Sequence, residues 1–256
     1  MSKTWTIKEE RQTKMLTFHN DKAVKSKYVK RLKAHAKADE IVQGTAWENG
    51  KGCAVGCTLE KYDHASYETE LGIPEWLARV EDAIFEGLPN KEAKKFAVDF
   101  LASIPVGVDL QKIKYKFTIY ILKENTLRVK KLKISEELKA QVVSAVEKCI
   151  EVNKAALKTG IFDESAAKSA ESAAKSAESA AWSAESAARS AAWSAAKSAE
   201  SAAWSAGSAA RSAAWSAGSA AWSAAWSAES AAWSAAWSAA YKRYAKYLLT
   251  LLKNSK

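Results

Sequence analysis

The sequence predicts a mainly α-helical protein, with a compact α-rich head over residues 1–160 and one long repeat helix over residues 161–240. Two observations predict the helices of the head: apolar residues recur at three- and four-residue spacings, and glycine and proline punctuate these segments. A third predicts the long helix: residues 171–236 are six consecutive 11-residue repeats rich in Ala and Ser. A basic amphipathic segment, 241–256, follows, and we expect it to cap the repeat helix.

For the first half of the head, the sequence predicts a short extended start at residues 5–7 followed by helices. Apolar spacing predicts a helix over 21–42, capped by Asn20 or Asp21 and ended by Gly44. Residues 44–56 contain four glycines without helical periodicity, which indicates a loop. A short segment ends at Gly72, a residue type that favours the position after a helix, and Pro74 opens a helix over 75–86.

Further helices are predicted in the second half of the head. A helix is expected from about Asn90 to about Ile104. Residues 110–122 fit both an alternating strand and a helix, and we favour the helix. Ser135, followed by two glutamates, predicts the start of a helix that ends near Lys158, with Gly160 beyond it.

The repeat places Ser at intervals of three or four residues, so the hydroxyl groups follow one nearly straight stripe along a helix. An 11-residue period matches about 3.67 residues per turn, which predicts a straight or slightly right-handed supercoil. At 1.5 Å per residue the six repeats would span about 100 Å. An Ala face opposite the variable column would allow close approach of another backbone.

Eight tryptophans of the repeat lie in the column that precedes the serines. They are Trp182, Trp193, Trp204, Trp215, Trp222, Trp226, Trp233 and Trp237. A lone helix would leave these indoles exposed to water, so we expect them to mediate homo-oligomerisation, as a coiled coil between copies of the chain. A solvated spacer helix and an ice-binding hydroxyl array are the alternatives, although bulky indoles would spoil a flat ice-binding face.

The densest group of reactive residue types lies between Trp47 and Tyr67. Cys53 or Cys57 could act as a thiolate nucleophile, which would require a base. His64 or His35 could supply that base, oriented by Asp39 or Asp63. The competing interpretation is structural: the glycines shape a turn, the cysteines are small buried apolar residues and His64 holds a loop.

Two other interpretations of the same segment involve binding without turnover. In the first, Lys51 and the glycine-flanked amides hold an anionic or nucleotide-like ligand, with Trp47, Asn49, Tyr62 and Asp63 around it. In the second, Cys53, Cys57 and His64, with His35 or Cys149, bind zinc, but this spacing is not a standard zinc pattern. We therefore expect neither a metal site nor a cofactor, and the phosphate-binding loop patterns are also missing.

Charge and cysteine content indicate which partners and which cellular compartment to expect. The formal net charge is +10, and the last sixteen residues carry five basic side chains and no acidic one. Dispersed lysines on helices are usually a solvated surface, so we expect neither nucleic acid nor a membrane as partner. Three cysteines and an N-terminus without a secretory signal favour a cytoplasmic protein with reduced thiols.

Four short motifs resemble a family of bacterial and phage proteins with no assigned activity. The motifs are NGKGCAVGCT at 49–58, YDH at 62–64, LGIP at 71–74 and LARVED at 77–82, together with the Ser-Ala-Ala tail. The resemblance implies no catalytic residue. A phage origin would imply a small oligomeric protein that binds a host factor or a nucleotide signal.

The functional expectation is a non-enzymatic homo-oligomer in which the repeat helix gathers heads that bind a ligand or protein partner. The alternative is a hydrolase or transferase that uses Cys53 or Cys57 with His64, so whether the chain is an enzyme stays open. A basic nucleic-acid-associated protein is the third hypothesis, although the sequence contains no groove-reading motif.

Overall fold

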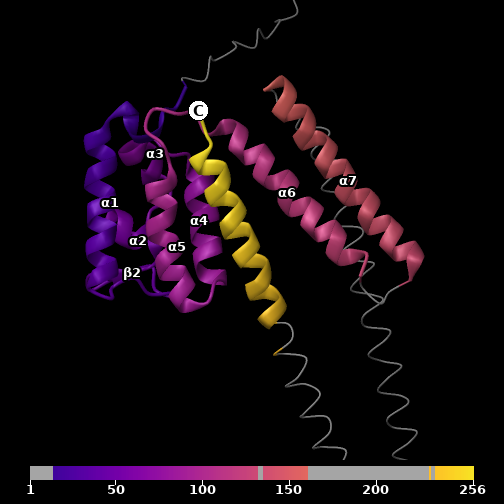
Figure 1. The fold of residues 1–256 in the computed structure, drawn as a ribbon, viewed down its shortest axis with the longest axis horizontal. Helices are drawn as coiled ribbons and strands as arrows, with labels where there is room; N and C mark the ends of the chain where they lie inside the picture. Colours follow the sequence, from indigo (N-terminus) through magenta and orange to yellow (C-terminus); the bar gives the residue numbers. More distant parts are fainter. Residues whose placement is uncertain (1–13, 132–134, 161–230, 232–233) are drawn as a thin grey trace, which may run out of the picture. The chain divides into compact units, whose positions relative to one another are not determined.

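The computed structural model describes residues 14–131, 135–160, 231 and 234–256. These ranges are mainly helical (Figure 1), so the predicted α-rich class is confirmed. The chain divides into two compact units, one of Met1–Lys114 with Tyr244–Lys256 and one of Tyr115–Arg243. This division follows packing, whereas the predicted boundaries at 160 and 240 follow composition.

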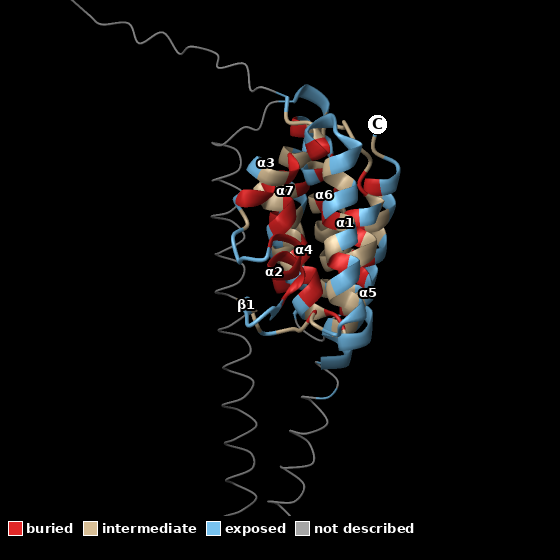
Figure 2. Cartoon of the chain, turned by 90° about the vertical axis from the view of Figure 1, so that its left-hand side faces the viewer, coloured by how far each residue is buried: buried red, intermediate tan, exposed pale blue. Residues whose placement is uncertain are grey.

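The described residues of the first unit that precede α6 form five helices, a short 3-10 segment and a hairpin. In chain order these elements are η1 (Thr17–Asn20), α1 (Lys22–Lys37), β1 (Trp47–Glu48), β2 (Lys51–Gly52), α2 (Ala54–Leu59), α3 (Ser66–Leu71), α4 (Glu75–Gly87) and α5 (Asn90–Ser103). Every residue of α2 is buried, because α1, α4 and β2 pack around it (Figure 2). The core of this unit therefore lies around α2.

Local signals located most of these helices correctly. Asp21 caps α1 by accepting a hydrogen bond from the Ala23 amide, at 2.7 Å. Gly72 ends α3 in the left-handed conformation (φ 60°), and Pro74 immediately precedes α4. The prediction of α5 is also confirmed.

Two predictions in this region were wrong. Helix α1 ends at Lys37 and not near residue 42, because Asp39 adopts a positive φ and turns the chain. Residues 44–56 are not one irregular loop. They contain the antiparallel β1–β2 hairpin, with Asn49 and Gly50 at its two-residue turn, and the first turn of α2. Asn-Gly is the preferred dipeptide for such a turn, since both residues need positive φ.

The second unit contains most of α6 (Gln111–Val129) and all of α7 (Glu136–Thr159). Residues 110–122 are therefore helical as favoured, and α7 has both predicted caps. The Ser135 hydroxyl accepts from the Leu138 amide at 3.3 Å, and Gly160 takes a left-handed conformation. Residues 234–253 are also helical.

The predicted oligomerisation residues fall almost entirely outside the described ranges, and so does the extended start at 5–7. Of the eight tryptophans only Trp237 is described, and its ring lies 5.6 Å from that of Tyr241. Within the first unit, Leu248 and Leu252 of the terminal helix are fully buried. No helix among the described residues combines the length and apolar character that crossing a bilayer requires.

Candidate functional site

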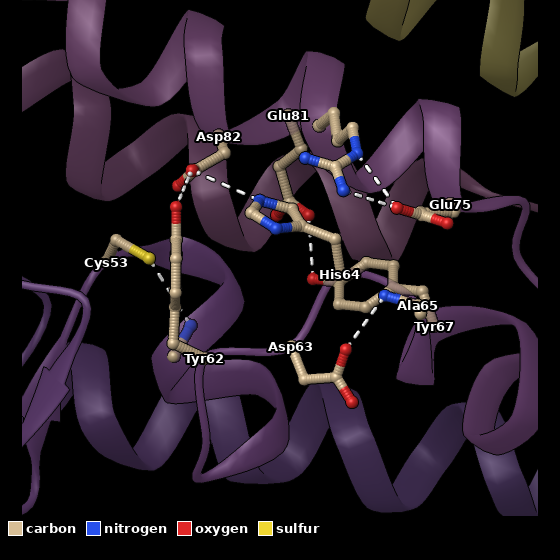
Figure 3. A network of polar contacts seen from close by, with 11 residues as sticks. Cys53, Tyr62, Asp63, His64, Ala65, Tyr67, Glu75, Glu81 and Asp82 are labelled. Atoms are coloured by element: carbon tan, nitrogen blue, oxygen red, sulfur yellow. Dashed lines mark hydrogen bonds and ion pairs between the residues drawn. The ribbon is translucent and has the colours of Figure 1, made fainter.

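The predicted site residues separate into two groups, one around His64 and one around His35. The group around His64 (Figure 3) is formed by the loop before α3, by α4 and by the start of α2. The group around His35 joins the end of α1 to the hairpin and to the residue after α2. Among the described residues, the two histidines have no partner in common.

Asp82 is the centre of the first group. Its Oδ2 accepts a hydrogen bond from the Tyr62 hydroxyl at 2.9 Å and lies 3.2 Å from His64 Nε2. The rings of Tyr62 and His64 pack edge to face, with their centroids 4.9 Å apart. Burial, followed by the bond to Asp82, raises the pKa of Tyr62 to about 12, so its hydroxyl is a neutral donor. The imidazole is thus oriented by Asp82 and not by Asp63.

Cys53 lies beside this group but acts as a helix cap. Its Sγ accepts from the Gly56 amide at 3.4 Å at the first turn of α2. Its side chain is buried, and burial, with a smaller contribution from the Asp82 carboxylate, raises the pKa of the thiol well above its ordinary value. The thiol is therefore neutral at physiological pH, which disfavours Cys53 as a nucleophile.

Cys57 has other hydrogen-bond partners. Its thiol donates to the carbonyl oxygens of Gly52 at 3.3 Å and Glu40 at 3.5 Å, and the residue is fully buried. Burial raises the pKa of this thiol to about 11. Neither cysteine forms a hydrogen bond with a histidine in the described part of the chain, so the activating base that a thiolate mechanism needs is missing there.

His35 is held between acidic and aromatic neighbours. Its Nδ1 lies 2.6 Å from Glu40 Oε2 and its Nε2 lies 3.9 Å from Glu60 Oε1. The Trp47 ring packs edge-on against the imidazole, with centroids 5.5 Å apart. Asp39, the predicted orienting partner, instead pairs with Lys94, which lowers the pKa of Asp39. His35 therefore joins α1, the hairpin and the end of α2.

The glycine-rich segment has few amides left for an anion. The Gly52 amide donates to Glu40 O at 3.1 Å, and the Cys53 amide donates to Thr45 O at 2.7 Å. Gly56 is required by close packing, because a Cβ there would lie 2.0 Å from the oxygen of Ala46. These glycines permit close approach of the protein's own backbone, which is the structural interpretation of the segment.

The remaining predicted ligand-binding residues also have structural surroundings. Asn49 forms the hairpin turn, and the exposed Lys51 is on β2. Asp63 accepts from the Ala65 amide at 3.1 Å and from the Ser66 hydroxyl at 2.5 Å, so it caps the start of α3. Of the two aromatic candidates, Tyr62 is 48% exposed, whereas Trp47 is half-buried.

A buried acid on α4, next to Asp82, was not singled out from the sequence. Glu81 is fully buried, and the Tyr67 hydroxyl donates to its Oε2 at 2.7 Å. Glu81 Oε1 has no hydrogen-bond partner in the described part of the chain. Burial raises the pKa of Glu81 well above 4.5, with the Asp82 carboxylate adding to the effect and the Tyr67 bond opposing it. The available signal was its spacing, since Glu81 lies on the apolar face of α4 four residues after Leu77.

The described residues contain no group of three or more His, Cys, Asp or Glu side chains arranged to hold a metal ion. Cys53, Cys57 and His64 thus do not converge as the zinc interpretation required. Comparison with known proteins adds no assignment, because neither a family model, nor a curated protein, nor a solved structure matches the chain.

Proposed function

We propose that this protein is a non-enzymatic homo-oligomeric assembly protein, in which the repeat helix gathers copies of a partner-binding head. One observation favours an assembly protein over an enzyme. Each reactive side chain that the sequence singled out in the head is used within the fold, either as a cap, in a hydrogen bond to the backbone or in an ion pair. With these side chains accounted for, the repeat is the unusual feature of the chain that still needs a function.

The ends of the repeat are joined to folded segments, which supports a structural role. It begins after α7, whose last turn is capped by Gly160. It leads into the helical residues 234–253, where Arg243 Nε donates to Glu124 Oε2 of α6 at 2.7 Å. Farther along the same helix, Ala245, Leu248 and Leu252 are buried. The repeat thus stands between two helical segments of the chain.

Sedimentation equilibrium of the full chain tests this proposal. The wild type is expected to sediment as a multiple of its 27.8 kDa mass at micromolar concentration. Replacing Trp182, Trp193, Trp204 and Trp215 together with Ala removes four indoles and favours helix formation. Truncating an interface Trp costs on the order of 2 kcal/mol, so association should weaken by at least about a thousandfold.

The matched control changes four charged residues of the same helical column, which are Glu185, Arg189, Lys197 and Glu200. Converting all four to Ala leaves the net charge unchanged and should leave the mass unchanged. Circular dichroism would show that both variants keep their helix content. A wild-type chain that is monomeric at 50 µM, or equal dissociation by both variants, would refute assembly through the indoles.

The second candidate, a hydrolase or transferase, is favoured by one contact: the Asp82 carboxylate orients His64 as an acid–base residue would need. The position of the thiols counts against it, because both are buried and both have raised pKa values. Thiol reactivity, described in the Discussion, distinguishes the two candidates.

A further inference from the structure

Helix α1 carries charges of one sign only. It contains seven basic residues and no acidic one, and it lies at the periphery of the first unit (Figure 2). Lys22, Lys30, Lys33 and Lys37 are all exposed. At 100° per residue these four side chains project within an arc of about 80°, opposite the buried Tyr28. They form a row about 22 Å long, which we name the lysine row.

No acidic residue in the described part of the chain neutralises the lysine row. Among the described residues, no acidic side chain lies within ion-pair distance of its four members. Three basic residues of α1 lie outside the row, and Lys27, which is also exposed, has its ammonium 5.0 Å from the centre of the Tyr28 ring. Arg31 pairs with Glu60 at 3.1 Å, and Lys25 donates to the carbonyl oxygens of Ala102 and Ile104. Arg31 and Lys25 thus have partners within the fold, whereas the four row lysines have no acidic partner among the described residues.

We propose that the lysine row binds the phosphate backbone of a nucleic acid duplex without sequence preference. The inference goes beyond the proposed function, since a monomeric chain would also carry the row. The net charge of +10 would favour the encounter. A row of positive charges matches the regularly spaced phosphates of a duplex. When lysines neutralise these phosphates, the condensed counterions of the duplex are released, and this release favours binding.

Other occupants fit less well. The only other exposed side chain in the arc is the small Ser26, so no large apolar group is available to insert into a bilayer. Helix α4 does not offer a free acidic face to a second copy, because Glu81 is buried and its other three acids have partners. Glu75 pairs with Arg79, Asp82 with His64, and Glu86 accepts from the Gly44 amide.

The salt dependence of binding tests the proposal. Four phosphate contacts predict a slope of log K against log salt of about −3.6, which is about a 150-fold loss of affinity from 50 to 200 mM NaCl. Fluorescence anisotropy of the full chain with a labelled 20-base-pair duplex measures this slope. Replacing Lys22, Lys30, Lys33 and Lys37 with Gln should reduce its magnitude by about 3.6, with helix propensity nearly unchanged.

The matched control removes four exposed lysines from other helices: Lys91, Lys112, Lys148 and Lys158, each changed to Gln. The control variant has the same net charge as the row variant, and its slope should change by less than about one. Equal losses in the two variants, or no duplex binding by the wild type at 100 µM, would overturn the proposal. Row-dependent binding to phosphatidylserine vesicles without duplex binding would overturn it in favour of a membrane. Anisotropy measures duplex binding and sedimentation measures assembly. The proposal of duplex binding and the proposal of assembly can therefore fail separately.

Discussion

Replacing Glu81 with Gln should remove a pH dependence that is built into the first unit. Glu81 is fully buried and has one hydrogen bond, from Tyr67 at 2.7 Å. Its pKa in the folded protein is raised well above 4.5, mainly by burial, whereas the unfolded chain should titrate near 4.5. Between these two values the folded state binds more protons than the unfolded state, so stability falls as pH rises.

The magnitude follows from proton linkage. Each pH unit between the unfolded and folded pKa values lowers the free energy of unfolding by about 1.4 kcal/mol. The loss therefore accumulates over the interval between the two pKa values and is complete once the pH exceeds the folded pKa. Below pH 4.5 both states are protonated and the contribution of Glu81 is constant. Gln keeps the shape of the neutral acid but does not titrate, so the variant should lack this slope.

Hydrogen exchange followed by mass spectrometry can measure the effect in the full chain. Peptides covering α3 and α4 report the local free energy of opening, after correction for the pH dependence of intrinsic amide exchange. The matched control is Glu75→Gln on the same helix, where the carboxylate is partly exposed and pairs with Arg79. The wild type and this control should share the slope that Glu81→Gln lacks. A wild-type slope equal to that of Glu81→Gln would refute a buried neutral acid.

Two further predictions concern α2. Cys57, with a pKa near 11, has about a hundredfold less thiolate at pH 8 than an ordinary thiol, so Cys53 and Cys57 should be alkylated far more slowly than the partly exposed Cys149. Alkylation of either buried thiol at the rate of free cysteine, mapped by mass spectrometry, would revive the enzyme hypothesis. Gly56→Ala places a Cβ 2.0 Å from a backbone oxygen and should destabilise α2 by about 3 kcal/mol or more. Gly44→Ala, in open space, should cost only about 1 to 2 kcal/mol for its positive φ, and equal exchange protection in the two variants would contradict the steric argument.

The helices could be predicted wherever the chain carries a local stop or start signal. Pro74 before α4 and Ser135 before α7 act through their own backbone and side-chain geometry, so no distant contact is needed to place them. The segment 44–56 was missed for the opposite reason. Two-residue strands and a six-residue helix are too short to show a period, and their pairing depends on contacts with the chain at Glu40 and Thr45.

The candidate site could be predicted only in part. Proximity in sequence suggested Asp63 as the partner of His64, but that carboxylate caps the next helix, and the actual partner lies 18 residues further along the chain. The pairing arises because α4 packs against α3, a tertiary contact that no local pattern encodes. The same packing buries Glu81, whose position on an apolar face was visible but whose burial was not.

The arrangement of charge suggests why assembly and the lysine row would belong to one molecule. A row of four lysines supports only weak, salt-sensitive binding to a duplex, because its attraction is electrostatic and without sequence readout. Heads joined through the repeat would present several rows to one polyanion, and each later contact would then form at a high effective concentration. The indoles of the repeat and the lysines of α1 lie far apart in the sequence, so a change in one set leaves the other set chemically intact. One variant can therefore lose assembly, and with it avidity, while it keeps the lysine row. Another variant can lose the lysine row while it keeps assembly.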